Sequence, residues 1–255
     1  MKQPTPDILV ARLRRVSAGL ERAGLDALVV THLPNIRYLT GFGGSSAVAV
    51  LAGGRLVFIT DGRYATEVAE VVKPSCPPLE LVVVDSTYDD ALARVVAGLE
   101  ARRVGVEGAY LSVSRFNLLA SKLSAGGGPR PELLVADRLI EAERLRKDAA
   151  EIALFREAAA MLDEVAVGIL DHVREGMREK EIAADIDWRI RRGGFERTSF
   201  ETIVASGPNA ALPHARPGDR ALSRGDLVIL DFGGVHGGYC VDMTRTVAVG
   251  ESSAE

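Results

Sequence analysis

Apolar residues change their spacing repeatedly along the first half of the chain, and this change predicts alternating helices and strands. In residues 8–23 they recur at helical spacing, and this helix is expected to end at Gly24. Short apolar runs follow, separated by turn residues and by further helical segments. The expected strands span residues 26–31, 47–51, 55–60, 79–85, 103–107 and 132–136, and the expected helices span 64–72, 89–102 and 112–123. Strands and helices mixed in this way predict a sheet covered by helices, an α/β fold.

The second half of the chain has longer periodic segments. Residues 149–174 and 179–192 have the spacing of two long amphipathic helices, and a strand–turn–strand segment follows them. Residues 124–131 have the composition of a linker, but the next few residues have the pattern of one more strand of the first domain. We therefore predict a first, α/β domain over residues 1–140 and a second, α+β domain over residues 141–255.

Two aspartates in the last hairpin, Asp231 and Asp242, are the strongest candidates for chemistry. A two-residue turn at His236-Gly237 would place them directly opposite each other on adjacent strands. Aspartate is depleted in strands and like charges across a ladder repel, so this arrangement needs compensation. Divalent cations supply it, because carboxylate oxygens are their preferred ligands and a close metal pair needs bridging carboxylates. The alternative is that one aspartate ends a strand and the other caps a turn.

Among the four histidines, His214 is the candidate for catalysis. It lies upstream of Asp231 in a loop rich in proline and glycine, where an imidazole could donate to a substrate oxygen or transfer a proton. His236 is expected at the tip of the hairpin, pointing away from the aspartates. His32 and His172 lack acidic or cysteine partners at ligand spacing and are expected to be structural.

Two further residues of the hairpin lie close to Asp242 in sequence. Cys240 would share its strand face, and we expect a small buried packing residue opposite Gly233 rather than a thiolate ligand. Thr244 shares the same face and could donate a hydrogen bond to Asp242.

The composition excludes several classes of protein. The 255 residues are 47% hydrophobic and 26% charged, which is typical of a soluble globular protein. A net charge of −4 argues against nucleic-acid binding, and the chain has no apolar run long enough for a membrane span. The N-terminus lacks the apolar core of a signal peptide, and Cys76 and Cys240 are too few for a disulfide framework. These features predict a cytoplasmic protein.

Several motifs resemble the Xaa-Pro aminopeptidase and prolidase group, metallopeptidase family M24 of the creatinase/aminopeptidase P type. The aspartates lie in LDFGG…GYCVDMTRT, and His214 lies upstream in SGPNAALPH. The motifs NIRYLTGF at residues 35–42 and TDGRY at residues 60–64 resemble the N-terminal domain of that group. The motif LRKDAAEI at residues 145–152 resembles the helix that opens its catalytic domain. The resemblance therefore extends through the whole chain.

The resemblance implies a creatinase-type N-terminal domain followed by the first half of a pita-bread catalytic domain. It also implies cleavage of the bond between an N-terminal residue and a following proline in peptides, with two divalent metal ions, commonly manganese and alternatively cobalt or zinc. Asp231 would bind one ion, Asp242 would bridge both, and His214 would contact the substrate. A homo-oligomer without nucleic-acid or membrane partners is expected.

The resemblance also implies a difference from the complete family pattern. The family takes its remaining ligands, a histidine and two glutamates, from the second half of the pita-bread, whereas this sequence ends at Glu255. We therefore expect an incomplete portion that is inactive by itself. The alternatives are a non-catalytic pita-bread protein that binds other proteins, and a metal-free hydrolase similar to creatinase. The aspartate pair argues against the metal-free alternative, because such a site has no use for two repelling carboxylates.

Overall fold

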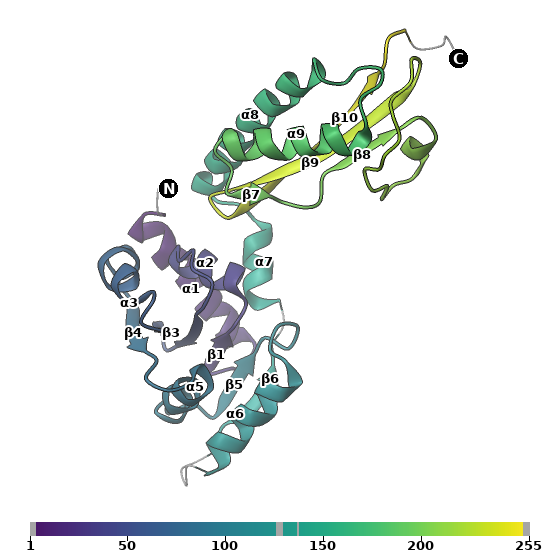
Figure 1. The fold of residues 1–255 in the computed structure, drawn as a ribbon. Helices are drawn as coiled ribbons and strands as arrows, with labels where there is room; N and C mark the ends of the chain where they lie inside the picture. The colour runs from purple at the N-terminus through teal and green to yellow at the C-terminus, as the bar shows by residue number, and fades with distance from the viewer. Residues whose placement is uncertain (1–3, 126–129, 137, 252–255) are drawn as a thin grey trace. The chain divides into compact units, whose positions relative to one another are not determined.

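The chain forms two compact units, residues 1–146 and 147–255. The computed structural model describes residues 4–125, 130–136 and 138–251 (Figure 1). Helix α7 (Leu139–Leu145) belongs to the first unit, because Ile140 lies in the core of that unit. The division therefore falls at the end of α7 and not after residue 140, where the sequence placed it.

The first unit contains a six-stranded sheet in the order β4-β3-β2-β1-β5-β6 (Figure 1). Apolar side chains of β1 point alternately to two different cores, so both faces of the sheet are buried. All six strands predicted from sequence form within a few residues of their expected bounds. The strands are β1 (Ala27–Val30), β2 (Val48–Ala52), β3 (Arg55–Thr60), β4 (Leu79–Val83), β5 (Arg103–Val106) and β6 (Glu132–Val135).

Helices cover this sheet on both faces, as the alternating pattern predicts. Helix α1 contributes to one core, and helices α5 and α6 contribute to the other. Helix α2 was not predicted, because it is short and its first turn contains a proline. The helices of this unit are α1 (Pro6–Arg22), α2 (Leu33–Thr40), α3 (Ala65–Glu67), a π-helical turn (Val68–Val72), α4 (Lys73–Ser75), α5 (Tyr88–Ala97), α6 (Val113–Ala125) and α7.

The second unit packs two long helices on one face of a four-stranded antiparallel sheet (Figure 1). Strand β9 is central: it pairs along its whole length with β10 on one side, and with β7 and β8 on the other. The elements are α8 (Ala149–Leu170), α9 (Glu179–Arg192), β7 (Arg197–Thr198), β8 (Ile203–Ser206), a 3-10 turn (Gly207–Ala211), β9 (Leu227–His236) and β10 (Tyr239–Ala248). Strands β7 and β8, of two and four residues, are too short to have shown a pattern in the sequence. None of the described helices combines the length and the hydropathy that crossing a bilayer requires.

A reciprocal cap begins helix α8. The Asp148 carboxylate accepts a hydrogen bond from the Glu151 backbone N–H at 3.0 Å, and the Glu151 carboxylate accepts one from the Asp148 N–H at 2.9 Å. The Tyr239 hydroxyl also donates to Glu151, at 2.6 Å, and so connects the start of the helix to the hairpin. The cap thus satisfies backbone donors that have no partner inside the helix.

Replacing Asp148 with alanine is expected to lower the free energy of unfolding by about 1 kcal/mol, because an N-terminal donor of α8 loses its acceptor. Urea unfolding followed by the fluorescence of Trp188, the one tryptophan of the chain, measures this in the second unit. The Asp171→Ala variant is the control. Asp171 follows the last turn of the same helix, where a negative charge is unfavourable, so its loss should not destabilise. Equal losses in both variants would contradict the capping role.

Candidate functional site

The hairpin of β9 and β10 turns at Gly237-Gly238, one residue later than predicted. Both glycines have positive φ, 58° and 76°, as the common two-residue hairpin turn requires at both central positions. The predicted turn at His236-Gly237 was wrong, because it would have forced a histidine into that conformation. The pairing partners consequently change: Asp231 lies opposite Thr244, and Asp242 lies opposite Gly233.

The corrected register keeps Asp231 and Asp242 on one face of the sheet, as diagonal neighbours. A slip of two residues preserves the face of every side chain, whereas a slip of one would have reversed it. The neighbouring residues Leu230, Phe232 and Val241 point to the opposite face, where they pack in the core under α8 and α9. The two aspartates therefore lie on the face of the sheet that these helices do not cover.

Electrostatic repulsion remains between these two carboxylates. Partial burial of its carboxylate and then repulsion from Asp231 hold the pKa of Asp242 above its ordinary value. The Thr244 hydroxyl donates to Asp231 Oδ1 at 2.8 Å, so its partner is Asp231 and not Asp242 as predicted. The basic side chain nearest in sequence, Arg245, points to the other face and contacts Asp163 of α8 at 3.3 Å. The two carboxylates thus form a negatively charged pair, to which a cation would be attracted.

The loop that carries His214 joins β8 to β9. Ile203 of β8 pairs with Asp231 of β9, so the loop leaves the sheet from the strand beside the first aspartate. His214 is exposed and lies in a turn closed by a hydrogen bond from the Ala215 N–H to the Leu212 carbonyl oxygen at 3.2 Å. The structure therefore places His214, Asp231 and Asp242 in the same unit, with the histidine on a surface loop.

The other histidines contact side chains of their own units. His236 ends β9 instead of occupying the turn, and its Nε2 lies 3.6 Å from a carboxylate oxygen of Glu157. His172 Nδ1 lies 2.8 Å from Asp185 Oδ2. His32 stacks on the Tyr110 ring with 3.6 Å between ring centroids.

Cys240 differs from its predicted environment. It lies opposite Val235, not Gly233, and its side chain is exposed and not buried. The physical reason is the register: Cys240 shares the face of Asp242, on which none of the described helices packs. Burial could not be inferred from residue type alone.

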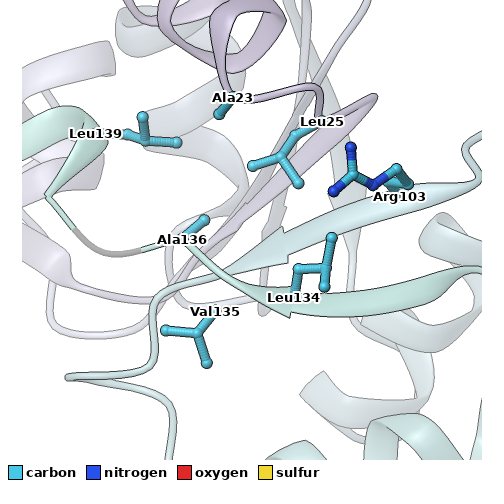
Figure 2. Close-up of a pocket in the computed structure, with 7 residues that line it drawn as sticks. All are labelled: Ala23, Leu25, Arg103, Leu134, Val135, Ala136 and Leu139. Atoms are coloured by element: carbon cyan, nitrogen blue, oxygen red, sulfur yellow. The ribbon is translucent and has the colours of Figure 1, made fainter.

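Two cavities differ in their suitability for the predicted chemistry. A cavity of about 340 Å³ adjoins Asp242, between α8 and the edge strand β10. Its lining consists of Phe155, Ala159, Leu162, Cys240, Val241, Asp242 and Met243. A second cavity, of about 360 Å³, lies in the first unit beside β6, where the Arg103 guanidinium lies among aliphatic side chains and none of the described lining residues is a carboxylate (Figure 2). The first cavity thus touches Asp242, but it lies on the side of β10 that faces α8, whereas the Asp242 side chain lies on the uncovered face.

The described residues bring two carboxylates together, but not a complete set of metal ligands. Within residues 4–125, 130–136 and 138–251, no group of three or more histidine, cysteine, aspartate or glutamate side chains is arranged to hold a metal ion. Asp231 and Asp242 thus fit part of a ligand set, since a hard divalent ion takes about six oxygen ligands.

Comparison with known protein families decides the identity of the fold. Residues 12–146 match the Creatinase/Prolidase N-terminal domain, and residues 153–255 match metallopeptidase family M24. The chain belongs to metallopeptidase family M24. Its second unit is accordingly part of a pita-bread domain, and its first unit is the creatinase-type domain that precedes it.

Individual M24 relatives support this assignment along the whole chain. The uncharacterized peptidase YqhT of Bacillus subtilis is 34% identical over 95% of this chain, and an Xaa-Pro dipeptidase of Pyrococcus horikoshii is 27% identical over 96% of it. The solved structure of an Xaa-Pro dipeptidase from Bacillus anthracis superposes with a TM-score of 0.88 at 31% identity and covers 96% of this chain. The chain spans 66% of the length of each of these three proteins.

Proposed function

We propose that residues 1–255 form part of a metal-dependent peptidase that cleaves the bond between an N-terminal residue and a following proline. The observation that carries the proposal is the pair Asp231 and Asp242, which repel each other on the uncovered face of the M24 hairpin. Two relatives bear the name Xaa-Pro dipeptidase, which supports the substrate class. The proposed cellular location is the cytoplasm, and the proposed assembly is a homo-oligomer.

In this proposal the two aspartates divide the work of holding two divalent ions, manganese being the first candidate. Asp231 would hold one ion, and Asp242 would contribute to holding both. The Thr244 hydroxyl donates to Asp231 Oδ1 and so restrains the orientation of that carboxylate. When bound, an ion pair supplies a nucleophilic water-derived oxygen and stabilises negative charge on the attacked carbonyl.

His214 has a separate role in this proposal. Its exposed imidazole donates a hydrogen bond to the substrate carbonyl oxygen, so that charge developing on that oxygen meets a fixed donor. Because residues 1–255 contribute only part of the ligand set, the proposal assigns the remaining ligands to residues outside this stretch.

A fusion tests the proposal directly. It joins residues 1–255 to the C-terminal third of the Bacillus anthracis Xaa-Pro dipeptidase. This chain matches 66% of the length of that protein, so the added third supplies the part that is not matched. With Mn²⁺ the fusion should hydrolyse Xaa-Pro dipeptides, whereas residues 1–255 alone should give no manganese-dependent hydrolysis. Calorimetric titration should show no tight pair of manganese ions on residues 1–255. Two outcomes would contradict the proposal. The first is hydrolysis by residues 1–255 alone. The second is a folded fusion that binds metal but cleaves nothing, which would favour a binding protein.

A further inference from the structure

Glu179 is a fully buried carboxylate that contacts the His214 loop at several points. It is the first residue of α9, and its side chain has no exposed surface. Its Oε1 accepts hydrogen bonds from the Ser206 N–H at 2.8 Å and from the Ser206 hydroxyl at 2.7 Å. The Asn209 amide donates to both oxygens, at 3.0 and 3.2 Å, and the Gly218 N–H donates to Oε2 at 3.2 Å. One carboxylate thus binds donors on both sides of His214.

The backbone at the start of α9 reinforces the same connection. The Glu179 N–H donates to the Arg220 carbonyl oxygen at 3.1 Å, and the Lys180 N–H donates to the Gly218 carbonyl oxygen at 3.2 Å. These helix N–H groups have no partner within the helix, so the loop satisfies them. The end of the loop is therefore fixed to α9 by backbone and by side chain.

A second set of contacts closes the base of the loop. The Arg220 guanidinium donates to the Ser206 hydroxyl at 2.6 Å and to both oxygens of Asp226, at 2.7 and 3.0 Å. Gly207 has a φ of +51°, and a Cβ there would lie 2.6 Å from Arg220 and from Asp226. The loop thus leaves and re-enters the fold through one hydrogen-bonded junction, centred on Glu179 and Arg220.

The chemistry at Glu179 requires a group that only accepts hydrogen bonds. Burial by itself raises the pKa of Glu179, but the hydrogen bonds from Asn209, Ser206 and Gly218 outweigh it and hold the pKa below its ordinary value. A glutamine would point its amide N–H₂ at one of these donors and leave it without an acceptor. A buried donor without a partner is destabilising, so the junction should open locally in that variant.

We infer that Glu179 is a positioning residue for His214, because it holds both arms of the loop 207–220 against the start of α9. The inference rests on the proposed role of His214. Glu179 stabilises the loop and not the hydrophobic core of the unit. Helix α9 contributes to that core through other residues, Ile182, Ile186 and Ile190. A small displacement of a substrate-contacting group costs up to about 10²-fold in rate, so the junction controls how well His214 can act.

The first experiment requires no catalysis. In residues 1–255, Glu179→Gln should raise the hydrogen exchange of amides 207–220 at least about tenfold and change the imidazole NMR signals of His214, because the local opening equilibrium shifts. Amides of α8 and β9 should keep their wild-type rates. The matched control is Glu181→Gln: Glu181 lies in the same helical turn but accepts from the Arg178 N–H, outside the loop. Unchanged loop amides, or a uniform acceleration through the whole unit, would overturn the inference.

The second experiment is a double-mutant cycle in the active fusion. Glu179→Gln should lower kcat/KM by about 10–100-fold with unchanged manganese content, and should have no further effect in a His214→Ala background. Equal losses in both backgrounds would identify a general structural role and overturn the inference. An inactive parent fusion would count against the proposed function alone, because the exchange and NMR experiment would still decide the role of Glu179.

Discussion

Replacing Asp242 with asparagine should lower the kcat/KM of the fusion for Xaa-Pro dipeptides by at least about 10³-fold. Asparagine keeps the shape of the side chain but loses the charge that holds two cations at once. Metal analysis of the purified variant should show the loss of at least one manganese ion per chain. Asp231→Asn is expected to act in the same direction.

Without metal, the same substitution should stabilise the fold instead of impairing the protein. The pKa of Asp242 is raised in the folded state, so the folded protein binds this proton more tightly than the unfolded protein and is less stable once the group ionises. Asp242→Asn should therefore increase the free energy of unfolding of residues 1–255 near neutral pH in a chelating buffer. As the pH falls through the pKa of Asp242, the wild type becomes protonated and the difference between the two proteins should disappear.

A matched control separates a site residue from an ordinary surface carboxylate. Asp163 lies on α8 and pairs with Arg245, which is on the opposite face of β10 from Asp242, so Asp163→Asn should leave both manganese content and kcat/KM near wild type. The metal-ligand role of Asp242 would be contradicted if Asp242→Asn kept its activity, or if it destabilised the metal-free chain as the loss of a structural hydrogen bond does.

The sequence was sufficient to place both aspartates on one face, but not to determine their partners. Strand periodicity assigns faces, and a face survives the two-residue difference between the predicted and observed registers. The register itself depends on the turn. The turn could be formed by His236-Gly237 or by Gly237-Gly238, and both of its residues must have positive φ. Two glycines adopt this conformation with less strain than a histidine and a glycine, so the turn forms at Gly237-Gly238.

Elements defined by distant contacts could not be predicted in the same way. Strands β7 and β8 are too short to show alternation and exist because β9 offers them partners. Glu179 has the sequence signature of an ordinary acidic residue in the first turn of a helix. Its complete burial follows only from the return of the chain through Gly218 and Arg220. The exposure of Cys240 likewise depends on which face the helices cover.

The second large effect is expected at Gly234, near the end of strand β9 (Leu227–His236), which also carries Asp231. A Cβ at this position would lie 2.3 Å from a ring carbon of Phe195, far inside the contact distance of two carbon atoms. The Phe195 ring is buried in the core of the second unit and cannot move aside freely. Gly234→Ala should therefore lower the free energy of unfolding by about 3 kcal/mol, because the strand or the ring must shift in a closely packed core.

Urea unfolding monitored by circular dichroism and by Trp188 fluorescence measures the effect of Gly234→Ala, and Gly168→Ala provides the control with the same added methyl group. A Cβ at Gly168 would approach only the end of the Arg189 side chain, at 2.7 Å, which can move aside. Position 168 lies in α8, where alanine is favoured over glycine by roughly 0.5–1 kcal/mol, so this variant should be as stable as wild type or slightly more stable. Equal stabilities for Gly234→Ala and wild type would show that β9 does not approach Phe195 as closely as described.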